Sequence, residues 1–133
     1  MEEYGKKLGM GFFSLQGGEN IGTRLINGNL TKSLPDGRTR VHCPMYTKIK
    51  EFSELDFGTV VREDYYRLQG QSSIYVLDEE LEFSHFIDCP GMSDVYSEPM
   101  QIEGELANLG SWRGFTFRVN LKTGEVFERA MIR

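Results

Sequence analysis

Apolar and polar residues alternate strictly in the C-terminal part of the chain. From Phe115 to Leu121 every odd-numbered position is apolar and every even-numbered position is polar, which is typical of a half-buried antiparallel strand. Met100 to Leu106 has the same period of two, with Gly104 on its apolar face. Val126 to Ile132 is expected to return antiparallel to the strand that begins at Phe115. The pattern therefore predicts three strands in this region.

Short turn motifs separate the other extended segments. Asn27-Gly28 favours a type I′ hairpin, because both central residues need positive φ. Gly124 is expected to take the left-handed position of a longer hairpin loop. Between such motifs we expect further strands at about residues 10–16, 20–26, 29–34, 38–43, 58–68, 73–77 and 82–88.

One segment has a different period. Between Thr47 and Phe57 the apolar residues Ile49, Phe52 and Leu55 recur every three positions, with charged residues between them. This spacing predicts a short amphipathic helix, which Gly58 ends.

Ten short strands with tight turns predict an antiparallel meander in a single domain over residues 1–133. A flat sheet of this size would leave one apolar face in water. We therefore expect the meander to close into a small β-barrel, which also removes the exposed edges. A β-sandwich is the alternative, and the fold class is mainly β with one short helix.

The length, the meander and the single domain resemble the calycin group of ligand-binding barrels in outline. The resemblance implies a barrel whose interior holds a small ligand. No motif carries over residue by residue, because those families usually have Gly-x-Trp near the first strand and the one tryptophan of this chain is Trp112.

Composition limits the classes of protein. The chain has 133 residues, which is enough for one domain. A hydrophobic content of 39% with nine Phe excludes a disordered chain. The net charge of −5 argues against a nucleic-acid-coating surface, and no apolar run approaches the roughly 20 residues of a membrane span. We expect neither a nucleic-acid nor a membrane partner.

The N-terminal residues and the cysteines indicate the compartment. Residues 1–7 begin with acidic side chains and no apolar signal segment follows them, so a cytoplasmic location is expected. Cys43 and Cys89 are each followed by proline. In that compartment they are expected to be free, buried thiols, with a disulfide between them as the alternative.

The two histidines and two cysteines are the only group with zinc-ligand chemistry. The strand pattern argues against a metal site because it directs Cys43 inward and His42 outward. We expect no metal and no cofactor. His85 can activate Cys89 or Cys43 as a nucleophile, which makes these three the candidate catalytic residues. We favour the alternative, a buried His85 bonded to a backbone carbonyl.

Residues 59–68 do not alternate. One face would carry Val61, Glu63, Tyr65 and Arg67, and the other face mixes charged and apolar residues as well. Glu63, Tyr65 and Arg67 are therefore candidate ligand-binding residues in a wet cavity. Alternatively, this is an edge or subunit-interface strand with cross-strand charge pairs.

Trp112 and Arg113 lie between Gly110 and Gly114 and are further ligand-binding candidates, since an exposed Trp can anchor a ligand or partner. The alternative for Trp112 is that it caps the end of the core. Four carboxylates near a predicted hairpin tip are expected to be a solvated cluster: Asp78, Glu79, Glu80 and Glu82.

Three functions fit these observations. The leading hypothesis is a non-enzymatic binding protein for a small molecule or a protein partner, assembled as a homodimer. The second is a small barrel enzyme, a hydrolase, isomerase or lyase, that uses Glu63, Tyr65 and Arg67, or His85 with a cysteine. The third is an inhibitor- or immunity-type module, which needs an exposed apolar patch or an extended acidic face.

Overall fold

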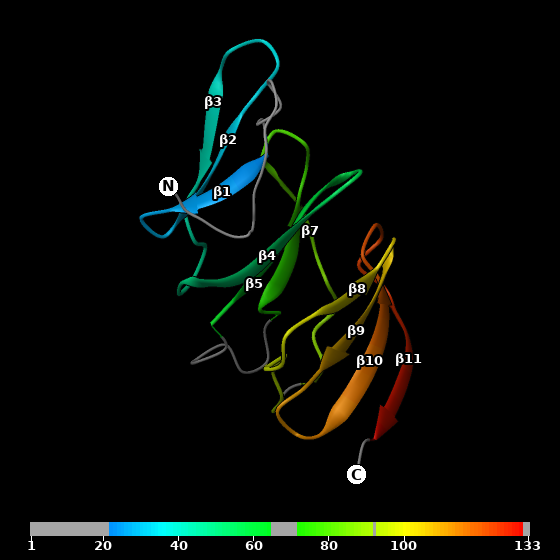
Figure 1. Cartoon of the computed structure of the whole chain (residues 1–133). Helices are drawn as coiled ribbons and strands as arrows, with labels where there is room; N and C mark the ends of the chain where they lie inside the picture. The colour runs from blue at the N-terminus through cyan, green and yellow to red at the C-terminus, as the bar shows by residue number, and fades with distance from the viewer. Residues whose placement is uncertain (1–21, 65–71, 92, 132–133) are drawn as a thin grey trace.

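The computed structural model describes residues 22–64, 72–91 and 93–131, and this part of the chain is all β (Figure 1). Its strands form three antiparallel sheets in which each strand pairs only with its neighbours along the chain. The mainly-β prediction is confirmed. The strand predicted at residues 10–16 lies outside the described residues.

The three sheets follow one another along the chain (Figure 1). The N-terminal sheet consists of β1 (Thr23–Ile26), β2 (Asn29–Ser33) and β3 (Thr39–His42). The middle sheet consists of β4 (Ile49–Leu55), β5 (Gly58–Glu63), β6 (Ile74–Leu77) and β7 (Phe83–Phe86). The C-terminal sheet consists of β8 (Gln101–Glu103), β9 (Leu106–Gly110), β10 (Phe115–Asn120) and β11 (Val126–Met131).

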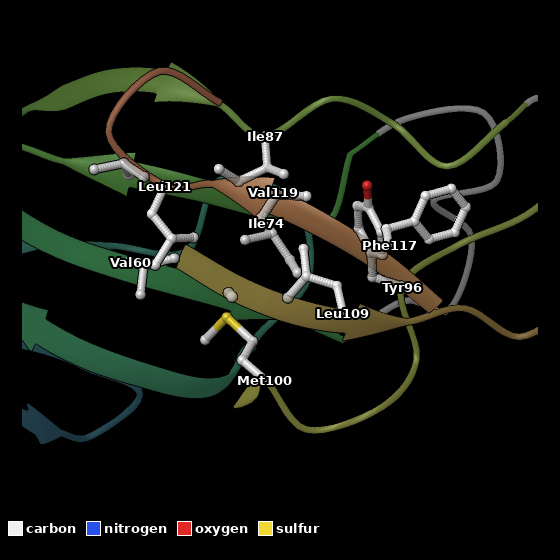
Figure 2. Close-up of a cluster of buried hydrophobic side chains, with 11 residues drawn as sticks. Val60, Ile74, Ile87, Tyr96, Met100, Leu109, Phe117, Val119 and Leu121 are labelled. Carbon is white, nitrogen blue, oxygen red and sulfur yellow. The ribbon is translucent and has the colours of Figure 1, made fainter. Parts of the chain in front are cut away.

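The two central strands of the middle sheet, β5 and β6, are covered on both faces. Towards the C-terminal sheet, Val60 and Ile74 pack in a core with Leu109 and Val119 (Figure 2). Towards the N-terminal sheet, the second core consists of Leu30, Ile49, Val61, Tyr75, Leu77 and Leu81. Every residue of β5 and β6 is buried, which explains why residues 59–63 do not alternate between apolar and polar.

The strands do not close into a barrel in the described part of the chain. Pairing is interrupted between β3 and β4 and again between β7 and β8. The apolar faces leave water because the sheets pack face to face. The barrel prediction, and with it the calycin outline, is wrong for these residues.

Residues 47–57 contain no helix. They contain β4, which pairs with β5, and the register shifts between Ile49 and Glu51. This bulge adds one residue, so Ile49 and Phe52 lie against the same core while Leu55 packs against the other. A spacing of three in a bulged strand imitates the helical period, and this is why the predicted helix is wrong.

The segment predicted as one strand from Met100 to Leu106 is a tight hairpin. Glu103 at the end of β8 pairs with Leu106 at the start of β9. Gly104 between them has a φ of +64°, a left-handed conformation that glycine adopts without steric cost. Gly104 therefore makes a turn and does not thin an apolar face.

The other described strand predictions are confirmed within a few residues at each end, except that β5 ends at Glu63 and residues 65–68 of the predicted 58–68 strand lie outside the described residues. They correspond to β1, β2, β3, β5, β6, β7, β10 and β11. The Asn27-Gly28 turn joins β1 to β2 with φ values of 52° and 83°, and Gly124 has a φ of +85°. Turn chemistry therefore located most strand ends.

Candidate functional site

One buried carboxylate lies where the β3–β4 connection meets the middle sheet. The side chain of Glu63 has no exposed surface. The backbone N–H of Met45 donates to Oε2 at 2.6 Å, and those of Tyr46 and Thr47 donate to Oε1 at 2.9 Å each. The Tyr75 hydroxyl donates to Oε2 at 2.5 Å. These four donors replace the water that an ionised carboxylate loses on burial.

Two further backbone contacts bring this connection to the end of β5. The Thr47 hydroxyl donates to the Asp64 carbonyl at 2.9 Å, and the Asp64 N–H donates to the Lys48 carbonyl at 2.8 Å. Residues 45–47 are thereby held beside Glu63, and their N–H groups point at its oxygens.

The hydrogen bonds extend from Glu63 to His42. A carboxylate only accepts, so the Tyr75 hydroxyl donates to it, and the Tyr75 oxygen accepts from Nε2 of His42 at 2.7 Å. Sequence alternation predicts that His42 points outward, but it points inward and Val41 is exposed. His42 can point inward because the Tyr75 hydroxyl is a hydrogen-bond partner for its ring. If Val41 pointed inward instead, this hydrogen bond would not form.

The protonation states in this network are fixed at neutral pH. Burial lowers the pKa of His42, and the nearby Glu63 offsets this only in part. Burial and the bond to Glu63 both raise the pKa of Tyr75. Burial alone would raise the pKa of Glu63, but the donors from Thr47 and Tyr75 and the other N–H groups outweigh it and lower that pKa. None of these groups is therefore poised to exchange a proton near pH 7.

Three exposed aromatic rings lie next to this network. We call Tyr46, Phe83 and Phe86 the aromatic patch; their exposed fractions are 47%, 46% and 39%. The ring centroids of Phe83 and Phe86 are 4.9 Å apart, and Tyr46 stacks on Phe86 at 6.3 Å with an interplanar angle of 27°. Tyr75 lies beneath them, with its centroid 6.3 Å from Phe83 and 6.1 Å from Phe86.

A bulge places both phenylalanines on one face. In a regular strand, Phe83 and Phe86 would point to opposite sides. The pairing of β6 with β7 shifts between Val76 and Leu77, so Phe83 lies opposite Leu77 and Phe86 lies opposite Tyr75. Both rings consequently face the side of the N-terminal sheet, which does not cover them.

The acidic cluster after β6 contacts the N-terminal sheet and is not simply a solvated tip. Basic side chains of that sheet reach the turn between β6 and β7. The contacts are Arg40 to Glu82 at 2.5 Å, Arg38 to Glu80 at 3.7 Å and Lys32 Nζ to the Glu79 carbonyl at 2.7 Å. These contacts tie the N-terminal sheet to one end of the middle sheet, at the edge of the aromatic patch.

His85 lies on the opposite face of β7. Its Nε2 is 2.9 Å from the Leu121 carbonyl, and its Nδ1 is 2.8 Å from the Ser84 hydroxyl. Because a carbonyl only accepts, Nε2 carries the proton and Nδ1 accepts from Ser84. The bond to a backbone carbonyl agrees with the favoured interpretation, but His85 is half-buried and not buried as predicted.

The two cysteines are free, as expected, but both are exposed. The prediction that they are buried is therefore wrong. Cys43 follows the last residue of β3, and Cys89 contacts the Gly91 backbone at 3.4 Å. Neither is hydrogen-bonded to His85 in the described residues, and no group of three or more His, Cys, Asp or Glu there is arranged to hold a metal.

Of the predicted ligand-binding residues, the structure describes Glu63, Trp112 and Arg113, and it does not bring Glu63 together with the other two. Glu63 is enclosed on the side of the N-terminal sheet, and Tyr65 and Arg67 lie outside the described residues. Trp112 and Arg113 lie in the β9–β10 turn of the C-terminal sheet. Trp112 is 66% exposed, so it does not cap the core.

Sequence reasoning did not identify the aromatic patch. Its signal is the uncharged run Phe83-Ser84-His85-Phe86 in a strand next to four carboxylates. Strict alternation conceals it, because only the bulge shows that both phenylalanines share a face. Tyr46 carries no local signal, since its place follows from the contacts of Glu63.

Comparison of the chain with protein-family models, with curated proteins and with solved structures gave no match. Across the described residues, no helix is both long and apolar enough to cross a membrane.

Proposed function

We propose that the protein is a non-enzymatic binding protein and that its partner is another protein, which contacts the aromatic patch. Aromatic side chains are enriched at protein interfaces, where a few of them contribute most of the binding free energy. Three adjacent rings, each exposed by more than a third, form such a group on the side of the middle sheet.

The observation that carries this proposal is the composition of the sheet edges. Six strands lie at an edge of the three described sheets, and β7 alone among them contains no Asp, Glu, Lys or Arg. The charged residues of the other five are Arg24 in β1, Arg40 in β3, Lys50, Glu51 and Glu54 in β4, Glu103 in β8, and Glu128 and Arg129 in β11. Proteins commonly protect exposed edges with charges, so an uncharged aromatic edge strand suits a surface that a partner covers.

Charge near the patch indicates the kind of partner. Glu80 and Glu82 lie at one end of β7, and the chain carries a net charge of −5. Glu80 and Glu82 are already paired with Arg38 and Arg40, so the charge left to complement is the net negative charge of the chain. A complementary surface would offer apolar or aromatic side chains that contact the rings, with Lys or Arg around them. This is the inhibitor- or immunity-type module among the three hypotheses.

The enzyme hypothesis has less support. Glu63 and His85 lie on opposite faces of the middle sheet, and each is already bonded to fixed partners. A general acid or base needs a free position towards substrate.

Selection from a displayed library of random peptides tests the proposal. The wild-type protein is the bait, and the variant Phe83→Ser/Phe86→Ser removes peptides that bind elsewhere. We expect peptides that combine aromatic residues with Lys or Arg, and at least a roughly tenfold loss of affinity in that variant. Amide chemical shifts of the wild type should change at Tyr46, Phe83 and Phe86.

Phe127→Ser is the matched control, because Phe127 is an equally exposed ring on another edge strand, β11. Binding that survives Phe83→Ser/Phe86→Ser but is lost in Phe127→Ser would exclude the aromatic patch. Sedimentation equilibrium of both variants tests whether the partner is a second copy of this chain. In that case the Phe83→Ser/Phe86→Ser variant should be a monomer, and Phe127→Ser should remain a dimer.

A further inference from the structure

The three consecutive N–H groups of residues 45–47 converge on a single point. Both oxygens of the Glu63 carboxylate lie there, and the Tyr75 hydroxyl points at it from β6. We call these four donors the carboxylate cradle. All four belong to residues outside β5, so the cradle is a surface that the rest of the chain presents and Glu63 fills.

We propose that the cradle is a carboxylate-binding site which the chain fills with its own Glu63, and that an anion there is what positions Tyr46. All four donors lie within 2.9 Å of the Glu63 carboxylate, and this carboxylate is the acceptor of each of them. If the carboxylate is removed, the N–H groups of residues 45–47 lose the acceptor that they have in the described structure, and unmade hydrogen bonds of this kind are costly.

The same anion links two parts of the aromatic patch. Tyr46 donates its N–H to Glu63 and stacks its ring on Phe86. Tyr75 donates its hydroxyl to Glu63, and its ring supports both phenylalanines from beneath. Glu63 never reaches the surface, so it acts on the patch only as a positioning residue.

Removing the side chain should leave a site of defined shape. Glu63→Ala deletes the Cγ methylene and the carboxylate, which are together the heavy atoms of acetate. Acetate should therefore bind Glu63→Ala in the cradle and accept the four donors. Acetamide has the same shape but no charge and presents an NH₂ group to N–H donors, so it should not bind.

Thermal unfolding of Glu63→Ala in increasing acetate tests the site. We expect Tm to rise with the logarithm of the acetate concentration once this exceeds the Kd, by about 5 °C at roughly ten times the Kd. Acetamide, or chloride at equal ionic strength, should not reproduce it. Glu82→Ala, which removes an exposed carboxylate, is the control that should show no such gain.

The position of Tyr46 is read from its ring protons by NMR. In the wild type they should be shifted by the ring current of Phe86, the shift should be lost in Glu63→Ala, and acetate should restore it. A rise in Tm without recovery of the Tyr46 shift would overturn the positioning role. A Tm that responds to acetate no more than to acetamide or chloride would overturn the anion site.

Hydrogen exchange of the wild type keeps the proposal testable if Glu63→Ala does not fold. The side chains of Met45 and Tyr46 are exposed. Their backbone amides should nevertheless be protected from hydrogen exchange as strongly as the amides of β5. Exchange at loop rates would contradict the cradle. None of these measurements needs a partner, so their failure is distinguishable from failure of the proposed function.

Discussion

The face of the middle sheet that meets the C-terminal sheet is apolar almost throughout, whereas the face that meets the N-terminal sheet holds a large share of polar contacts. On the first face the polar exceptions include the Arg62–Glu51 pair at 2.8 Å, whose Glu51 also accepts the Met100 N–H, and His85, whose Nε2 donates to the Leu121 carbonyl. On the second face, Glu63, Tyr75 and His42 form one network.

The difference shows how a small covering sheet can be attached. β1 to β3 contribute few apolar side chains to the interface, chiefly Leu30, so hydrogen bonds and ion pairs hold the sheet in place. Because such contacts are local, part of the middle sheet stays uncovered. The C-terminal sheet has no such gap over Val60 and Ile74 (Figure 2). The face towards the C-terminal sheet therefore contributes most of the apolar core, and the face towards the N-terminal sheet leaves the aromatic patch exposed.

Phe117→Ala should produce the largest effect, because it opens a cavity in the apolar core. Phe117 is 3% exposed and packs edge-on against Tyr96. We expect the free energy of unfolding to fall by about 4 kcal/mol, measured by urea denaturation. Phe127→Ala, at an exposed ring, should cost less than about 1 kcal/mol. Equal losses would mean that the core does not dominate stability.

Glu63→Gln should have the next largest effect, on the polar face. The amide keeps the shape but turns one acceptor into a donor, which leaves two donors without that acceptor. These are the Met45 N–H and the Tyr75 hydroxyl if the NH₂ group replaces Oε2, or the Tyr46 and Thr47 N–H groups if it replaces Oε1. We expect a loss of about 2–3 kcal/mol. Glu82→Gln is the exposed control and should cost far less, so a near-neutral Glu63→Gln would contradict the network.

The stability of the wild type and that of Glu63→Gln should depend differently on pH. The pKa of Glu63 is lower in the folded state than its ordinary value of 4.5. Its stabilisation is therefore complete above about pH 4.5 and is lost as the pH falls through the lower, folded pKa. In urea titrations from pH 7 downward, the stability gap between wild type and Glu63→Gln should be constant at first and should narrow below pH 4.5. A gap that widens in acid would show that the carboxylate is not the stabilising group.

Arg40→Gln should have the smallest effect. The Arg40–Glu82 pair is close but partly exposed, and such pairs contribute about 0.5 kcal/mol. The loss should disappear in about 1 M salt, where exposed charges are screened. The loss caused by Phe117→Ala should persist there, and a salt-sensitive core variant would remove the distinction between the faces.

Alternation predicted the strands that have one wet face. Residues 115–121 follow a period of two because β10 has its core on one side only. β5 is enclosed on both sides, so Glu63 resembled a cavity lining in the sequence although both faces of its strand are covered. Two bulges make the period of two misleading. The bulge after Ile49 gives β4 an apolar spacing of three that resembles a helix, and the bulge in β7 places Phe83 and His85 on opposite faces of the sheet.

The candidate site depends on contacts that no local pattern contains. Glu63 was selected as a candidate ligand-binding residue because residues 59–68 do not alternate, and the structure encloses it among four donors instead. Its partners come from residues 45–47 and from Tyr75, whose approach depends on how the sheets stack. The sequence does not show whether a glutamate carboxylate is surrounded by water or by hydrogen-bond donors of the protein.

The pairing of each strand with its chain neighbours bears on how the molecule folds. Each sheet is a series of hairpins, so none has to wait for a distant segment, and the entropy of loop closure stays small. The stacking of sheets is the non-local step. Because β5 and β6 are buried on both sides, they reach their final environment only after both outer sheets have docked. Hairpins are therefore expected to form early, and most of the stability late.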